Sequence, residues 1–257
     1  MLVIVKESGR EMSAEAAEIF ANRLRKKPNL VVGFATGSTP VELYKLLIRM
    51  HKQEGLDFSK VTTFNLDEYV GLPPSHQASY ARFMRKNLFE HLNIPEHSIH
   101  LPDGMADDVD AYCDWYEGEI QKAGGIDLQI LGIGANGHIA FNEPGSSLGS
   151  RTRIKTLAGT TLRDNARFFK SKKDLPKYAI TMGVGTIMDA KEILLLASGT
   201  GKADALRAAV EGPITVQCPA SIVQLHRKVF IVLDRDAASK LAGSYPDSWH
   251  SSLLLER

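Results

Sequence analysis

The sequence has 257 residues, of which 44% are hydrophobic and 24% charged, a balance that indicates a globular protein and excludes a disordered or fibrous chain. Lysine and arginine number 31 against 30 acidic residues, so no overall field attracts nucleic acid or an anionic membrane, and we expect a small-molecule partner. Two isolated cysteines, Cys113 and Cys218, and the lack of a signal-peptide or membrane-spanning pattern predict a cytoplasmic protein.

Short β-branched runs alternate along the chain with longer stretches of helical periodicity. In chain order, strands are predicted at 30–35, 61–66, 127–133, 192–197 and 229–233. Helices are predicted around 16–24 and 41–50, and at 77–92, 109–123, 202–210 and 236–242. This alternation predicts an α/β fold with a largely parallel, doubly wound sheet and helices on both faces, Rossmann-like in architecture. Ligands in such folds bind beyond the carboxyl ends of the strands, so we expect the functional residues at those ends.

No repeat or Pro/Gly/Ser-rich linker divides the chain, so residues 1–257 are predicted to form a single domain. One irregular stretch, 162–177, carries clustered arginine and lysine residues before Pro176. A lid over 158–180 and a solvated helix end with its loop both fit this charge pattern, and the sequence leaves the choice open.

The first predicted strand leads into a segment that is a candidate phosphate cradle. Gly37 allows the backbone to approach a ligand, Ser38 and Thr39 offer hydroxyls, and the following helix presents unpaired N–H groups at its start. The alternative is a local capping box, in which Pro40 occupies the first helical position and Glu42 closes the helix start without a ligand. The spacing favours neither interpretation.

The second strand ends in the acidic pair Asp67-Glu68, where sheet enzymes place catalytic groups. Successive side chains of an extended chain point to opposite sides, so one carboxylate can face a pocket as a general base while its neighbour makes a structural hydrogen bond. An exposed acidic turn is the alternative, and the residues alone favour it.

The third strand ends in a glycine-rich segment that imitates a dinucleotide-binding loop. Residues 132–137 match G-x-G-x-x-G, but Pro144 interrupts any helix and no acidic residue lies about 20 positions beyond to hold a ribose, so we reject a dinucleotide site. The loop instead brings His138 and Glu143 toward one small site, a pair suited to moving a proton on and off oxygen. A structural histidine is the alternative. The sequence has no H-E-x-x-H, zinc-ligand or EF-hand pattern, so we expect no metal and no cofactor.

Three ordered segments, FATGSTP at 34–40, NLDEYVGL at 65–72 and GHIAFNEP at 137–144, together resemble the glucosamine-6-phosphate deaminases. The resemblance continues through 150–157, 165–169 and 208–212 and covers nearly the whole chain. It implies conversion of glucosamine 6-phosphate and water to fructose 6-phosphate and ammonia, an aldose–ketose isomerisation with deamination in amino-sugar catabolism, without a cofactor.

By position, the resemblance implies that Asp67 moves a proton between C2 and C1 of the sugar, and that His138, supported by Asn136 and Glu143, opens the pyranose ring. Some members of the family carry aspartate where this chain has Asn136. The residues implied to hold the substrate phosphate are Gly37, Ser38, Thr39, Arg167 and Lys202.

The resemblance also concerns regulation. Ser146, Arg153 and Lys155 match residues through which allosteric members bind an acetylated sugar phosphate at a subunit interface. This sequence lacks the longer tail that completes the family's regulatory pocket, so activation by N-acetylglucosamine 6-phosphate, and the choice between a monomer and a homo-oligomer, stay open.

Two other functions compete with this interpretation. A 6-phosphogluconolactonase-like hydrolase would use the same type of fold and the histidine loop, but the Asp67-Glu68-Tyr69 context argues against it. A non-catalytic sugar-phosphate sensor would keep the binding loop, but it has no need of Asp67, His138 and Glu143 together.

Overall fold

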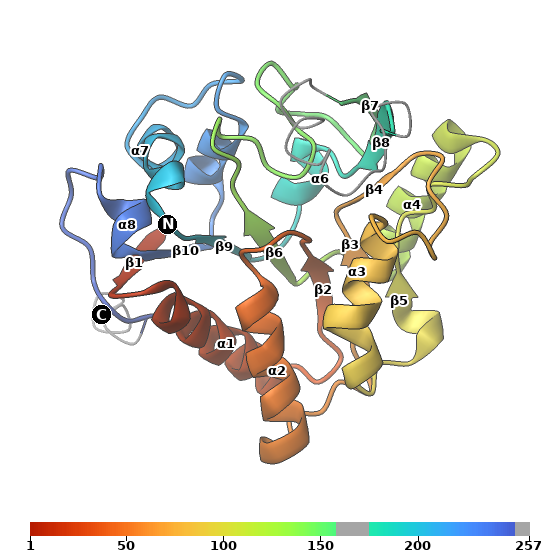
Figure 1. Ribbon diagram of the computed structural model, residues 1–257, viewed down its shortest axis with the longest axis horizontal. Helices are drawn as coiled ribbons and strands as arrows, with labels where there is room; N and C mark the ends of the chain where they lie inside the picture. The colour runs from red at the N-terminus through yellow and green to blue at the C-terminus, as the bar shows by residue number, and fades with distance from the viewer. Residues whose placement is uncertain (158–174, 250–257) are drawn as a thin grey trace.

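The computed structural model describes residues 1–157 and 175–249, which contain a seven-stranded parallel sheet in the order β1-β10-β9-β6-β2-β3-β5 (Figure 1). All of the strand pairs in this sheet are parallel. The strands are β1 (Leu2–Lys6), β2 (Val31–Phe34), β3 (Thr62–Asn65), β5 (Ile99–His100), β6 (Leu128–Gly132), β9 (Ile193–Ala197) and β10 (Val229–Asp234). The predicted parallel sheet is confirmed.

Helices cover both faces of this sheet, and each face has its own hydrophobic core. Alternate residues of the central strands enter opposite cores, as Ile130 and Leu131 of β6 do. One core packs against α1 and α2, which lie side by side in Figure 1, and the other packs against α4, α6 and α7. Burial on both faces explains why the strands read as continuous apolar runs rather than alternating ones.

The helices of the described residues begin and end at local signals. Ser8 caps α1 by accepting a hydrogen bond from the Glu11 amide, and α2 ends at Gly55, whose φ of 70° suits glycine. The α-helices are α1 (Gly9–Lys26), α2 (Val41–Glu54), α3 (Tyr80–Asn87), α4 (Val109–Lys122), α6 (Val184–Met188), α7 (Ala203–Val210) and α8 (Arg235–Ala238). Short 3-10 helices are η1 (Phe89–His91), η2 (Glu96–Ser98), η5 (Thr200–Lys202) and η6 (Pro219–Leu225). No helix of the described residues is long and apolar enough to cross a membrane.

A second, antiparallel sheet of three strands was not predicted from the sequence. It contains β4 (Asp67–Tyr69), β8 (Tyr178–Thr181) and β7 (Arg153–Thr156), in the order β4-β8-β7. β4 follows β3 after a single residue, Leu66, so the chain passes directly from the large sheet to the small one. The expectation of an exposed acidic turn at Asp67-Glu68 is wrong, because both residues are buried within a paired strand.

Three other predicted segments differ from the structure. The predicted helix 77–92 is α3 followed by η1, since the Ser79 side chain caps α3 by accepting from the Arg82 amide. The predicted helix 236–242 is the four-residue α8, which begins one residue earlier than expected because Asp234 caps it, and which ends at Ala238. Of the candidate lid 158–180, residues 158–174 lie outside the described residues, and its last residues belong to β8.

Candidate active site

The candidate site is a cavity of about 300 Å³ at the carboxyl ends of β2, β3 and β6. β2 pairs with β3 on one side and with β6 on the other, so the chain changes winding direction at this point. A topological switch of this kind leaves a crevice in which open α/β sheets bind ligands. The lining residues used below are Gly37, Ser38, Thr39, Asp67, Tyr80, His138, Ala140, Phe141 and Lys202.

One part of the cavity wall is the loop between β2 and α2. Gly37 has a φ of 101°, which a side chain would strain, and nothing lies within 4 Å of the place where a Cβ would be. The capping-box alternative is wrong: Pro40 is the N-cap rather than the first helical residue and no side chain caps α2, since Glu42 instead pairs with Lys45 at 3.0 Å. The start of α2 therefore offers backbone donors and a positive dipole end to an anion.

A cationic side chain joins this wall from another element. Lys202 ends η5, the short turn after β9, and lines the same cavity as Ser38 and Thr39. Arg167, the other predicted phosphate ligand, lies outside the described residues. The described residues thus bring together one lysine, two hydroxyls and the start of a helix, a donor set that suits a phosphate group.

Asp67 is the titratable group on the β3 side of the cavity. Its exposed fraction is 6%, and the aromatic rings of Tyr80 and Phe141 line the cavity with it. Burial, reinforced by the nearby charge of Glu68, raises the pKa of Asp67 to about 8. A carboxylate with such a pKa is a much stronger base than an exposed aspartate, and its protonated form can return the proton.

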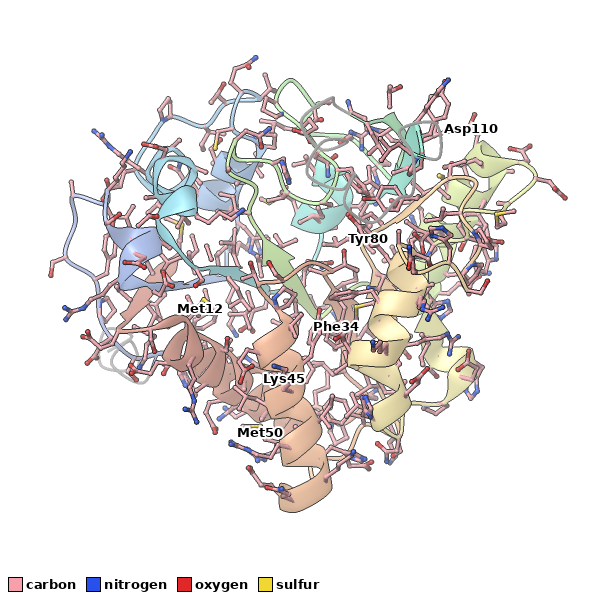
Figure 2. The ribbon with its side chains drawn as sticks, in the orientation of Figure 1. Met12, Phe34, Lys45, Met50, Tyr80 and Asp110 are labelled. Carbon is pink, nitrogen blue, oxygen red and sulfur yellow. The ribbon has the colours of Figure 1, made fainter. Side chains whose placement is uncertain are left out.

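Glu68 points away from the cavity and has a structural role. Its carboxylate accepts hydrogen bonds from the Tyr69, Tyr80 and Ala81 amides and from the Ser79 hydroxyl, at 2.7 to 3.0 Å. Burial raises the pKa of Glu68, and these four donors oppose the rise. Glu68 thereby holds the start of α3, where Tyr80 lies (Figure 2). Strand alternation gives the two neighbouring carboxylates different surroundings, which is the arrangement that the residues alone did not favour.

The small sheet joins Asp67 to the histidine loop. Asp67 pairs with Thr181 of β8, and the Thr181 hydroxyl accepts a hydrogen bond from the Phe141 amide at 3.1 Å. The Asn142 side-chain amide donates to the carbonyl of Met182 at 2.8 Å. These contacts fix the segment 139–143 beside β8 and so place two distant parts of the sequence around one cavity.

The histidine loop is a tight turn built around glycine. The Gly134 amide donates to the His138 carbonyl at 2.9 Å, and Gly137 has a φ of 84°. A Cβ on Gly134 would overlap the imidazole ring of His138, so this glycine leaves the space that the ring occupies. The loop carries Asn136 and His138 on the same turn, with Glu143 five residues beyond His138.

The three polar side chains of this loop form a relay. The His138 Nδ1 atom lies 2.7 Å from Asn136 Oδ1, Asn136 Nδ2 donates to Glu143 Oε2 at 2.7 Å, and His138 Nδ1 lies 3.6 Å from the same carboxylate oxygen. Because a carboxylate only accepts, it fixes the Asn136 amide with its oxygen toward the imidazole. Nδ1 therefore carries the proton in neutral His138, and Nε2 is left as the basic nitrogen.

Comparison with known proteins identifies the family of the chain. A family model described as glucosamine-6-phosphate isomerases/6-phosphogluconolactonase matches residues 6–232. The chain belongs to this family. It is 52% identical over 239 residues to a glucosamine-6-phosphate deaminase of Thermoanaerobacter sp. (strain X514), covering 93% of this chain and 94% of the relative. It is 50% identical to one of Clostridium perfringens (strain SM101 / Type A), covering 94% of this chain and all of the relative.

Solved structures of the family separate into near and distant relatives. A structure described as a monomeric glucosamine-6-phosphate deaminase superposes with a TM-score of 0.91 at 45% identity and covers 93% of this chain and all of that chain. A 6-phosphogluconolactonase from Trypanosoma cruzi has a TM-score of 0.74 at 22% identity, with 94% and 97% covered, and shares the fold alone. The resemblance to the deaminases that the motifs predicted is confirmed.

The predicted regulatory residues lie away from the cavity lining. Arg153 and Lys155 are alternate residues of β7 and share one side of the strand. Arg153 donates to Asn142 Oδ1 at 3.0 Å, and burial lowers its pKa. Ser146 is buried, and its hydroxyl has no hydrogen-bond partner among the described residues. Arg153 thus contacts the residue that precedes Glu143, which links β7 to the relay.

Sequence reasoning gave no site role to Tyr80, Ala140 and Phe141 of the cavity wall. Tyr80 and Phe141 stack with their ring planes 8° apart and line the cavity beside Asp67. Ala140 is the one non-glycine among the described residues with a positive φ, 51°. A strained backbone of this kind concentrates at functional sites. The glycines before His138 hinted at unusual backbone there, but nothing in the sequence singled out the aromatic pair.

Proposed function

We propose that this protein converts glucosamine 6-phosphate and water to fructose 6-phosphate and ammonia in cytoplasmic amino-sugar catabolism. The single observation that carries the proposal is the convergence of Asp67, His138 and Lys202 on one cavity of about 300 Å³. An acid–base carboxyl, an imidazole with a defined basic nitrogen and a cationic donor are the groups that this reaction needs, and the near relatives are named for it.

The phosphate is held by the residues that face it from two elements. Gly37, Ser38 and Thr39 supply backbone and hydroxyl donors at the start of α2, and Lys202 supplies a charged donor from η5. Arg167, predicted from the family motifs, completes the set. Binding energy from this remote group orients the sugar for the proton transfers.

Ring opening is the task of His138. Its Nε2 removes the proton of the C1 hydroxyl and returns a proton to the ring oxygen as the C1–O5 bond breaks, giving the open-chain aldehyde. The imidazolium formed between these steps is stabilised by Glu143, whose carboxylate lies 3.6 Å from Nδ1 and holds Asn136 against that nitrogen.

Isomerisation is the task of Asp67. The carboxylate removes the C2 proton and delivers it to C1, while O1 gains a proton and the C2 ammonium group loses one, which leaves an iminium ion at C2. Water then hydrolyses the iminium ion to the ketone and releases ammonia. The substrate carries its amine on C2, and in the ammonium form that amine favours the ionised Asp67 that the first step requires. The raised pKa of Asp67 matches both halves of this transfer.

The test is an assay with purified protein and glucosamine 6-phosphate in excess EDTA, with ammonia and fructose 6-phosphate measured together. We expect the two products in equal amounts and no loss of rate with EDTA, because side chains supply every proton-transfer group. Turnover of 6-phosphogluconolactone without turnover of the amino sugar would establish the lactonase instead. Binding of the amino sugar without either reaction would indicate a sensor.

We also propose that Ser146, Arg153 and Lys155 bind an acetylated sugar phosphate that modulates this activity. The contact from Arg153 to Asn142 supports a coupling to the adjacent Glu143. N-acetylglucosamine 6-phosphate should lower the KM for substrate in the native protein, and Arg153→Ala should abolish that response. A KM independent of the acetylated sugar would contradict the proposal.

A further inference from the structure

A buried aspartate outside the active cavity holds the turn that carries Lys202. Asp234 ends β10, has an exposed fraction of 6% and is not among the residues that line the cavity. Its carboxylate accepts hydrogen bonds from the Ser198 hydroxyl, from the Gly199 amide at 3.0 and 3.1 Å, and from the Ala237 amide at 2.8 Å. One side chain therefore joins the end of β9, the following turn and the start of α8.

The turn depends on this anchor at its first residue. Gly199 has a φ of 88°, which L side chains rarely adopt, and its carbonyl accepts a hydrogen bond from the Lys202 amide at 3.1 Å. Asp234 thus fixes the N–H of the residue whose carbonyl closes the turn on Lys202. A change at Asp234 reaches Lys202 through two consecutive hydrogen bonds, from the Gly199 amide to the Asp234 carboxylate and from the Lys202 amide to the Gly199 carbonyl.

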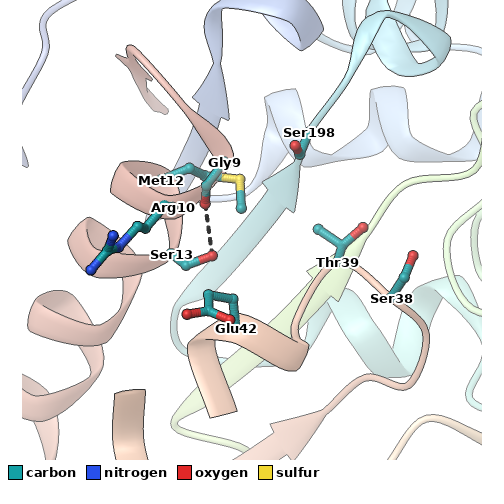
Figure 3. Close-up of a pocket in the computed structure, with 8 residues that line it drawn as sticks. All are labelled: Gly9, Arg10, Met12, Ser13, Ser38, Thr39, Glu42 and Ser198. Carbon is teal, nitrogen blue, oxygen red and sulfur yellow. Dashed lines mark hydrogen bonds between the residues drawn. The ribbon is translucent and has the colours of Figure 1, made fainter. Parts of the chain in front are cut away.

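The first turn of α1 lies against the pair formed by Ser198 and Asp234. A Cβ on Gly9 would lie 2.8 Å from the Ser198 hydroxyl oxygen and 3.6 Å from Asp234 Oδ2, so the start of α1 packs closely on the pair. Gly9 and Ser198 lie together in Figure 3, at the margin of a second cavity that Ser38 and Thr39 also line. Ser198, which donates to Asp234, and the phosphate loop therefore border the same second cavity.

We propose that Asp234 is a positioning residue for the substrate phosphate, acting through Gly199 on Lys202. The inference rests on the proposed role of Lys202 in binding that phosphate. Asparagine in place of Asp234 has nearly the same shape, but it is neutral and directs an N–H₂ group toward donors that need an acceptor. The turn then loses its fixed geometry, and Lys202 no longer meets the phosphate in one orientation.

The experiment is a double-mutant cycle on steady-state kinetics with glucosamine 6-phosphate. Asp234→Asn should raise KM about tenfold and change kcat less than about threefold. Lys202→Ala should raise KM at least as much, and the double variant should match Lys202→Ala within about twofold. Asp204→Asn is the matched control, because Asp204 lies in the first turn of α7 and pairs only with the surface Lys240 in the described contacts; its KM should not change.

The outcomes separate the two proposals. If Lys202→Ala leaves KM unchanged, the phosphate role of Lys202 fails and the positioning role fails with it. In a second outcome, Lys202→Ala raises KM, and Asp234→Asn raises KM by the same factor in the Lys202→Ala background as in the native protein. Lys202 then binds phosphate and Asp234 acts by another route, which overturns this inference alone. Should Asp234→Asn fail to fold, Ser198→Ala replaces it, because it removes one donor to Asp234. The inference is supported if Ser198→Ala raises KM in the native protein but not in the Lys202→Ala variant. It is overturned if Ser198→Ala raises KM by the same factor in both.

Discussion

The two walls of the cavity hold their polar groups in opposite ways. On the proton-transfer wall Asp67 has an exposed fraction of 6%, and Glu143, which contacts His138 of this wall, has an exposed fraction of 9%. On the phosphate wall Gly37 and Ser38 are exposed, and their geometry comes from the backbone between β2 and α2. A base that must remove a proton from carbon gains strength from leaving water, whereas donors that meet a dianion must be reachable from water. The first wall should therefore control turnover and the second should control binding.

The sharpest way to test this division is to neutralise the buried base. Asp67→Asn should lower kcat by about 10² to 10⁴-fold with little change in KM, since an amide cannot accept the C2 proton but nearly preserves shape. Steady-state kinetics, with circular dichroism to check folding, measures the effect. Near-normal turnover would remove Asp67 from its role.

The same measurement on the phosphate wall should give the complementary result. Lys202→Ala removes charge-assisted hydrogen bonds worth about 1.5 to 3 kcal/mol, so KM should rise by about 10 to 100-fold while kcat changes little. Lys240→Ala is the matched control, because Lys240 pairs with Asp204 on the surface. A fall in kcat equal to the rise in KM would contradict the division, because the two walls would then act as one unit.

The large and the small sheet differ in how far the sequence could predict them. The five central strands, β2, β3, β6, β9 and β10, are largely buried and were predicted from their apolar runs, and their alternation with helices predicted the parallel sheet. The edge strands β1 and β5 are only partly buried and were not predicted. The small sheet left no such signal, because β7 is polar and β4 is only three residues long. The chain around Asp67 therefore looked like an exposed turn until its pairing with β8 was known.

Site residues followed the same rule. Asp67, His138 and Glu143 could be proposed from the sequence because they follow strands or glycine turns in recognisable motifs. The roles of Glu68 and Asp234 depend on amides that lie 1 to 13 and 3 to 35 residues away, respectively, and only the folded chain brings these together. The residues from Thr39 to Glu42 match a capping box, but no side chain caps α2, and Glu42 accepts a hydrogen bond from Lys45 instead.

The buried base should also reduce stability at alkaline pH. The folded-state pKa of Asp67, about 8, lies above its value in the unfolded chain, about 3.9, so folding binds a proton between these values. Stability from this group is complete below about pH 4 and is lost as pH rises through about 8. Asp67→Asn should therefore be more stable than the native protein at pH 9, by about 1 to 3 kcal/mol, with a smaller difference at pH 5. Urea unfolding at both pH values tests this without substrate, and an equal difference at the two would contradict the burial argument.

The smallest expected effect concerns the relay, where only one of the three groups is acidic. Asn136→Asp places a carboxylate at a position now occupied by an amide oxygen 2.7 Å from His138 Nδ1, nearer than Glu143 at 3.6 Å. Even if the new carboxyl shares a proton with Glu143, negative charge lies closer to the ring and favours imidazolium. Because neutral His138 begins ring opening, the acidic limb of kcat/KM should move to higher pH, by about 0.5 to 1 unit.

This shift is best measured as a difference between the native and Asn136→Asp proteins at one ionic strength. Titration of the substrate phosphate is common to both and cancels in the comparison. His138→Ala is the control, because its residual activity should no longer respond to the charge at position 136. Superimposable acidic limbs would mean that the hydrogen bond from His138 Nδ1 orients the ring without tuning its charge. Asn136→Asp also replaces the hydrogen bond of 2.7 Å from Asn136 to Glu143 with two carboxyl groups. A limb displaced toward acid would mean that repulsion between these two groups moves them away from His138.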